Sequence, residues 1–163
     1  MCVLKIYSQT TSFKDNAALK RLPVYSIHEK GDVRRKRTGE LHDKYRVSLD
    51  VSDAEWDELS LQTADAVEFL STNRKALSDL LRCSDDTEAF LDFPLWSRLS
   101  GEIVNQNDHI PKKLIALAGE LGLGIEMSIY AQDAFDGLGE SAPETTLAEQ
   151  DGGGQPATRP ESK

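Results

Sequence analysis

Alternation of hydrophobic and polar residues predicts five β-strands within the first 131 residues. The clearest case is residues 45–51, where every second position is apolar and the positions between are Arg46, Ser48 and Asp50. Side chains of a strand point to opposite faces in turn, so this pattern is typical of a strand with one buried face. Shorter apolar or alternating runs predict strands at 3–7, 24–27, 89–96 and 125–130, and Pro94 places the fourth at a sheet edge or a bulge.

Apolar residues at helical spacing predict three helical regions between these strands. Ser12 is expected to cap a short helix that Pro23 ends. Ser52 and Glu55 have the spacing of a capping box and predict the start of a longer helix, which residues 71–73 interrupt. Its apolar stripe contains Trp56, Leu59, Val67 and Leu70. A last helix is expected to open at Asp108 or His109 and to stop at Gly122, with inward-facing Leu114, Ile115, Leu117 and Ala118.

The order of these elements predicts an α+β fold. It matches the ferredoxin-like βαββαβ arrangement, an antiparallel sheet with helices on one face, and a C-terminal αβ unit would extend that sheet. We expect residues 1–131 to form a single α+β domain. Residues 132–163 hold five of the eleven glycines and three of the six prolines, which predicts a disordered acidic tail.

Length and composition narrow the class of protein. The chain has 163 residues, 39% of them hydrophobic, which suffices for one folded core. No apolar run approaches the roughly 20 residues that span a bilayer, and the first residues do not resemble a secretion signal. We therefore expect a cytoplasmic protein without a membrane partner.

Cys2 and Cys83 are expected to be free thiols, and the three histidines lack the spacing of a metal site.

Charge is distributed unevenly along the chain. Residues 48–131 carry a net charge of −10, and the whole chain carries −9. Such a surface repels phosphates, so general nucleic-acid binding is disfavoured, whereas a basic protein is attracted. The candidate partner-binding residues on this acidic face are Asp53, Asp57 and Glu58. The alternative is that the acidic residues only keep the protein soluble.

One basic cluster contradicts this overall charge. It comprises Arg34, Arg35, Lys36 and Arg37, between the second and third predicted strands. Arginine forks match carboxylates and phosphates, so the cluster is a candidate anion site. The alternative is a solvated hairpin tip that protects strand edges from aggregation.

The sequence shows no recognisable set of catalytic residues. It has no motif that pairs a nucleophile with a base. A phosphate-binding loop precedes a helix, whereas Gly122–Gly124 follow the predicted one. We therefore predict a non-enzymatic protein-binding domain without a cofactor, of the kind that acts as an immunity-type inhibitor of a basic protein. The alternative is a sensor of a small molecule or phosphate ligand that uses residues 33–37. A homodimer through an edge strand is also open.

Three stretches of the chain resemble a bacterial family, domain of unknown function 4279. They are YRVSLDV at 45–51, EFLSTNRKALSDL at 68–80 and LIALAGELGLGIEMSIY at 114–130. The resemblance covers most of residues 1–131 and implies a small α+β domain. It implies no functional residues, because the family has no established activity.

Overall fold

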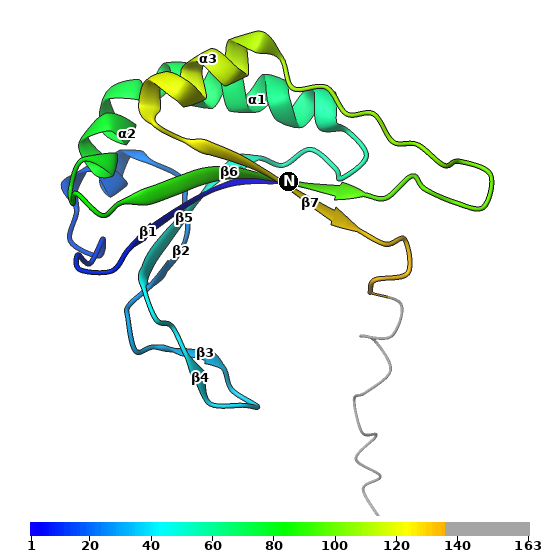
Figure 1. Cartoon of the computed structure of the whole chain (residues 1–163). Coiled ribbons are helices and arrows are strands. Elements are labelled where there is room, and N and C mark those ends of the chain that lie inside the picture. The colour runs from blue at the N-terminus through cyan, green and yellow to red at the C-terminus, as the bar shows by residue number, and fades with distance from the viewer. Residues whose placement is uncertain (136–163) are drawn as a thin grey trace, which may run out of the picture. The chain divides into compact units, whose positions relative to one another are not determined.

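A curved five-stranded β-sheet with helices on one face makes up the folded part of the chain (Figure 1). The computed structural model describes residues 1–135. They comprise a compact unit, Met1–Gln132, and the first residues of a second unit that starts at Asp133. The sequence-predicted tail, 132–163, lies almost entirely outside the described residues.

The strand order of the main sheet is β2-β5-β1-β6-β7. Its strands are β1 (Cys2–Ser8), β2 (Val24–His28), β5 (Tyr45–Ser52), β6 (Glu88–Trp96) and β7 (Gly124–Tyr130). Neighbouring strands are antiparallel except β6 and β7, which are parallel. The short strands β3 (Val33–Arg35) and β4 (Glu40–Leu41) form a separate hairpin. The predicted α+β class with a mostly antiparallel sheet is confirmed.

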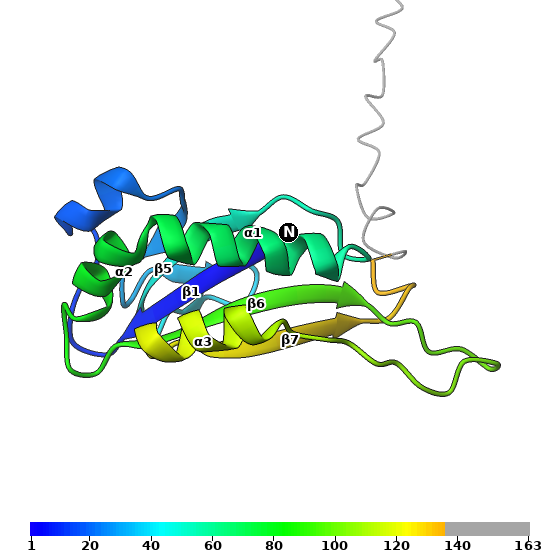
Figure 2. The same cartoon turned by 90° about the horizontal axis from the view of Figure 1, so that it is seen from above.

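Three α-helices cover one face of this sheet (Figure 2). They are α1 (Leu59–Thr72), α2 (Arg74–Leu81) and α3 (Lys112–Leu121). The predicted interruption at 71–73 is confirmed, since Asn73 separates α1 from α2. Gly122 ends α3 with a φ of 70°, a left-handed conformation that glycine adopts without strain. Among residues 1–135, no helix combines the length and apolar character needed to cross a membrane.

The two faces of the sheet differ in chemistry because β1 alternates strictly. Leu4 and Ile6 are fully buried under the helices, beside Leu49, Val47 and Leu91 of the neighbouring strands. The opposite, open face carries polar and aromatic side chains. At its centre Lys5 forms an ion pair with Asp92, and the Ser128 hydroxyl donates a hydrogen bond of 2.6 Å to the same carboxylate. This open face is where the fold can place a binding site.

The predicted capping box at 52–55 is wrong, because α1 begins only at Leu59. Ser52 is still part of β5, where it pairs with Cys2 of β1. Its hydroxyl donates a hydrogen bond to Asp65 at 2.5 Å. The amino group of Met1 also bonds the carbonyl of Ala54, which holds the chain at the sheet for two further residues. Trp56 consequently lies in the connection before α1 and not on its apolar stripe.

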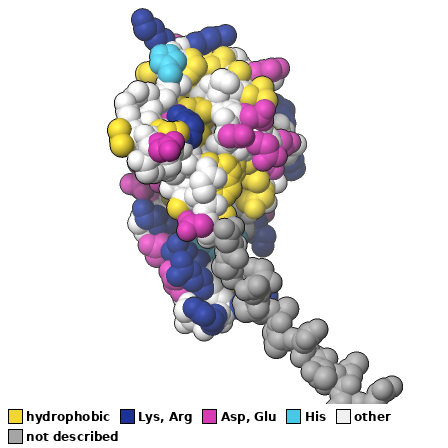
Figure 3. Space-filling view, turned by 90° about the vertical axis from the view of Figure 1, so that its right-hand side faces the viewer, with side chains coloured by type: hydrophobic (Ala, Val, Ile, Leu, Met, Phe, Trp, Pro, Cys, Tyr) yellow, Lys and Arg dark blue, Asp and Glu magenta, His cyan; other side chains and the backbone are white. Residues whose placement is uncertain are grey.

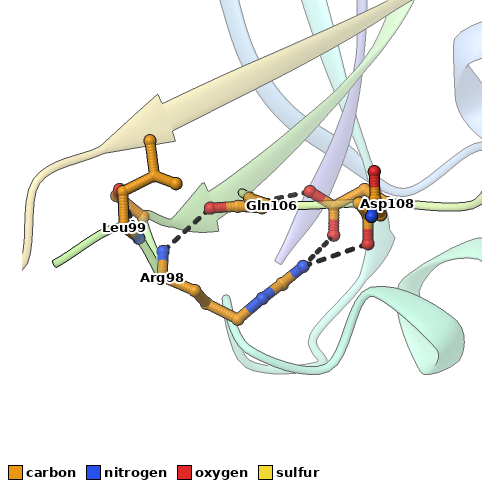
Figure 4. Close-up of polar contacts among 6 residues, drawn as sticks. Arg98, Leu99, Gln106 and Asp108 are labelled. Atoms are coloured by element: carbon orange, nitrogen blue, oxygen red, sulfur yellow. Dashed lines mark hydrogen bonds and ion pairs between the residues drawn. The ribbon is translucent and has the colours of Figure 1, made fainter. Parts of the chain in front are cut away.

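The other two predicted helix starts are also wrong. A 3-10 helix, Ala17–Arg21, replaces the expected helix at Ser12, and Asn16 caps it by accepting a hydrogen bond from Ala18 N at 2.9 Å. The last helix starts after Pro111, because the side chain of Asp108 bonds Arg98 and Gln106 and does not cap a helix. As Figure 4 shows, the Arg98 guanidinium donates a hydrogen bond to the Asp108 carboxylate (2.6 Å). The Gln106 side chain accepts a hydrogen bond from the backbone N–H of Arg98 and donates one to Asp108. These bonds fix the long connection between β6 and α3.

Two sequence predictions about single residues are also wrong: the edge or bulge at Pro94 and the inward orientation of Ile115. Pro94 lies on an interior strand, where it pairs with Ser128 of β7. The proline is tolerated there because the pairing of β6 with β1 ends at Asp92, so its missing N–H interrupts no ladder. Ile115 was expected to face inward, but it is 53% exposed on the outer side of α3.

Asp86 joins the end of β1 to the turn before β6. Its carboxylate accepts hydrogen bonds from the hydroxyls of Ser84, Ser8 and Thr10 and from the backbone N–H of Gln9. The bonds from Ser84 and Ser8 are the main reason why the pKa of Asp86 is held well below its usual range. The ionised form is therefore the one that the fold stabilises.

We predict that Asp86→Asn lowers stability at neutral pH and that the difference from the wild type shrinks in acid. The folded-state pKa of Asp86 is depressed, so the stabilisation by its ionised carboxylate is complete above the unfolded-state pKa of about 4. It is lost as the pH falls further. Urea denaturation at neutral and acidic pH measures both effects. Asp85→Asn is the matched control, since Asp85 is exposed and lines the same turn. Equal destabilisation by both substitutions would contradict the prediction.

Candidate functional site

A cavity of about 280 Å³ opens on the polar face of the sheet, between the start of β6 and the β3–β4 hairpin. In Figure 1 this hairpin projects from the open side of the sheet, opposite the helices. The volume is near the lower limit for small-molecule sites in proteins. We name it the hairpin cavity; its lining residues are Tyr7, Arg34, His42, Asp43, Lys44, Arg46, Glu88 and Phe90.

The register of β1 brings the strand residues of the hairpin cavity together. Tyr7 lies opposite Arg46 of β5 on one side and opposite Glu88 of β6 on the other. The rings of Tyr7 and Phe90 stack with centroids 5.7 Å apart, and the Arg46 guanidinium lies 5.6 Å from the centre of the Tyr7 ring. The wall of the cavity formed by the sheet therefore combines aromatic surface with a cation.

Three cationic side chains line the hairpin cavity, and they differ in their partners. Lys44 forms an ion pair with Glu88 at 2.8 Å, and this hydrogen bond raises the pKa of Lys44. Arg34 forms an ion pair with Glu40 at 3.0 Å. Arg46 donates from Nε to the hydroxyl of Ser48 at 3.1 Å, and it has no carboxylate partner among residues 1–135. Of the three, Arg46 is therefore the one that forms no ion pair within the described residues.

His42 occupies the root of the hairpin. Its backbone bonds Gly31 and Asp32, each at 2.8 Å, and its ring stacks on His28 with centroids 4.4 Å apart. Burial lowers the pKa of His42, and the positive charges of His28, Arg46 and Arg34 lower it further, against a weaker opposite effect of Asp32. Both effects favour the neutral form of the His42 imidazole.

The structure brings one of the four predicted basic-loop residues to the hairpin cavity. Arg34 lines it, whereas Arg35 is exposed and pairs with Glu40 at 3.5 Å. Lys36 and Arg37 lie exposed in the turn between β3 and β4 and do not line the cavity. Lys and Arg side chains gather at the lower end of Figure 3, at the level where Figure 1 shows the hairpin.

The predicted acidic residues lie elsewhere, in the connection between β5 and α1. Asp53, Asp57 and Glu58 are all exposed there. Asp53 borders a shallow depression together with Asp50 and Asp65. None of these five carboxylates forms an ion pair within the described residues. They make an acidic surface that is separate from the hairpin cavity.

Most of the hairpin cavity was missed by sequence reasoning. The alternation at 45–51 placed Arg46 on the polar face of its strand. Tyr7, Lys44 and Phe90 had no motif to mark them, because they become neighbours only through strand pairing. The available signal was the polar and aromatic side chains on the non-core positions of β1, β5 and β6.

The remaining candidate groups do not form a site. Trp56 packs against Trp96 and Tyr130 with ring centroids 4.7 and 4.9 Å away, and both tryptophans are partly exposed and not fully buried core anchors. Cys2 and Cys83 are not bonded to each other; Cys2 is buried, which raises the pKa of its thiol. Within residues 1–135, no three His, Cys, Asp or Glu side chains are grouped so that they could hold a metal ion.

Comparison with known proteins gives no further identification: no family model, no curated protein and no solved structure matches this chain. The resemblance to the domain of unknown function 4279 therefore stays a prediction.

We predict that His28→Phe raises the pKa of His42. The phenyl ring keeps the stacking and the burial but removes a positive charge that disfavours protonation of His42. An NMR titration of the histidine ring protons measures the shift. His109→Phe, which replaces an exposed histidine outside the cavity, should leave the titration of His42 unchanged. An unchanged His42 pKa in the His28 variant would show that the two rings do not interact electrostatically.

Proposed function

We propose that this protein is a non-enzymatic binding domain for a small anionic molecule, which it holds in the hairpin cavity. The observation that carries the proposal is the Arg46 guanidinium, which is half-buried and lacks a carboxylate partner among residues 1–135. Removing a charge from water without a counter-charge is costly. An anionic ligand beside Arg46 would supply that counter-charge.

The surroundings of Arg46 define the chemistry of this ligand. Arg34 and Lys44 also line the hairpin cavity, each in an ion pair with a glutamate, and arginine side chains suit phosphate or carboxylate oxygens. The stacked rings of Tyr7 and Phe90 offer an apolar surface beside these donors. A volume of about 280 Å³ is suited to a small metabolite. The geometry therefore favours a small phosphorylated or carboxylated metabolite with a planar or apolar part.

We predict that a ligand of this class loses affinity when Arg46 is neutralised. Inorganic phosphate, pyrophosphate, citrate and adenosine monophosphate serve as probes in calorimetric titrations of the full chain. Loss of a hydrogen bond to a charged group costs about 1.5–3 kcal/mol, so Arg46→Gln should weaken binding roughly 10- to 100-fold. Added salt should weaken binding of the wild type.

The matched control for this prediction is Arg37→Gln. It makes the same change of charge in the same hairpin, but Arg37 does not line the cavity. Its affinity should stay close to that of the wild type. Equal loss in both variants would show that the probes respond to the net charge of the hairpin and not to the hairpin cavity.

We propose a second function, recognition of a basic protein by the acidic surface, in the manner of an immunity-type inhibitor. It is supported by Asp53, Asp57 and Glu58, which are exposed and form no ion pair within residues 1–135. Figure 3 shows one group of Asp and Glu side chains at the upper right of the view, with further acidic side chains elsewhere on this face. Exposed carboxylates that form no ion pair are available to steer a basic partner.

We predict that reversing these three charges slows association with such a partner. A basic protein retained by the immobilised full chain at low salt provides the probe, and stopped-flow mixing measures the association rate. Asp53→Lys, Asp57→Lys and Glu58→Lys together should reduce the rate about tenfold or more at low ionic strength. The control reverses Asp15, Asp79 and Glu102, which are also exposed and change the net charge equally. If both triple variants associate at the same reduced rate, only the net charge matters.

We also propose that β2, β5, β1 and β6 form the core of a ferredoxin-like βαββαβ fold. The observed order of these four strands and their antiparallel pairing support this assignment. The 3-10 helix at Ala17–Arg21 would then stand in the place of the first helix, and α3 with β7 would be an addition.

A further inference from the structure

Strand β7 forms one edge of the main sheet (Figure 2). Within residues 1–135 it pairs only with β6, so the outward N–H and C=O groups of Gly124–Tyr130 have no strand partner there. Such groups are a template for pairing with another chain. Soluble proteins usually protect an edge of this kind with a bulge, a proline or several charges.

The two edges of the sheet differ in this protection. At the opposite edge, β2 follows Pro23 and carries an irregularity between Val24 and Ser26. In contrast, β7 pairs with β6 over seven consecutive residues without a register shift, and Glu126 is its only charged residue. Ile129 of β7 is 56% exposed and Ile115 of the neighbouring helix α3 is 53% exposed. The β7 edge is therefore long, regular and flanked by exposed aliphatic side chains.

The sequence of β7 is complementary to itself in the antiparallel direction. A two-fold axis at Met127 pairs all seven residues of one copy with those of another. It places Ile125 opposite the partner's Ile129 and Glu126 opposite the partner's Ser128, so like charges do not face each other. It also places Gly124, which has no side chain, opposite the partner's Tyr130, so no two bulky side chains meet at the ends of the pairing.

We propose that β7 is an interface for a second copy of this chain, with the two β7 strands antiparallel about an axis at Met127. The two five-stranded sheets then form one continuous sheet, and the α3 helices of both copies lie on the same side of it. Side chains at paired positions share a face in this register, so Ile125, Met127 and Ile129 of both copies lie on the helix-covered side. This is a closed, isologous interface that produces a dimer and not a filament.

Disulfide cross-linking of full-length variants tests the register. In a Cys83→Ser background, Met127→Cys places two thiols directly opposite each other at the axis, within the Cα separation that a disulfide needs. Ile125→Cys is the matched control, because its two thiols would lie about 14 Å apart along the strands. We expect oxidation to cross-link the Met127 variant and not the Ile125 variant. Equal cross-linking of both, or cross-linking of the Ile125 variant alone, would overturn the proposed register.

Sedimentation of the unmodified full chain over about a hundredfold range of concentration tests the dimer itself. We expect a monomer–dimer equilibrium that Ile129→Glu shifts toward the monomer by about tenfold or more in the dissociation constant, since it buries an unpaired charge. Ile129 is exposed in the single chain, so this variant should still fold. Tyr25→Glu, at the 60% exposed Tyr25 on β2, should leave the equilibrium unchanged. A monomer at every concentration, or a dimer that only the Tyr25 variant disrupts, would refute the interface.

Discussion

The pairing of β1 on both of its sides is the constraint on which the rest of the structure depends. Leu4 lies opposite Leu49 of β5 and Leu91 of β6, and all three are fully buried under the helices. A slip of one residue would turn these leucines toward solvent and bury Lys5, so the register is strongly determined. The same register puts Tyr7 between Arg46 and Glu88 on the open face. The packing of the core therefore also determines the geometry of the hairpin cavity.

Periodicity was sufficient to locate the five strands of the main sheet, but not the short strands β3 and β4 or the helix starts. The alternation at 45–51 predicted a strand with one buried face, and Val47 and Leu49 are indeed fully buried. Ser52 with Glu55 had the pattern of a capping box, but a cap forms only if the chain is free to turn at that serine. The pairing of Ser52 with Cys2 and the bond from Met1 to Ala54 keep it extended. These contacts join residues about fifty positions apart, and no local pattern contains them.

Local sequence patterns were also insufficient to identify the residues of the hairpin cavity. A run of four basic residues was visible at 34–37, yet the sequence could not tell which of them faces the sheet. In the structure Arg34 lines the hairpin cavity, whereas Arg37 lies exposed in the turn and does not line it. The central residue of the proposed anion site is Arg46, an isolated arginine on a strand. It lies over the ring of Tyr7 and has no acidic partner among residues 1–135. Neither property can be read from neighbouring residues in the chain.

Gly124 connects the hairpin cavity to the edge of the sheet. It pairs with Phe90, and a Cβ on residue 124 would lie 3.3 Å from the Cβ of Phe90, closer than side chains normally approach. A larger residue would therefore press on the Cβ of Phe90, the residue whose ring stacks against Tyr7. The glycine leaves β7 without a side chain at one end of the edge, opposite the partner's Tyr130 in the proposed pairing. A substitution chosen to fill the edge at this position would disturb the cavity, whereas Ile129, at the other end of β7, can be changed without contact to Phe90. The two proposed binding surfaces thus share one strand pair but depend on different residues of it.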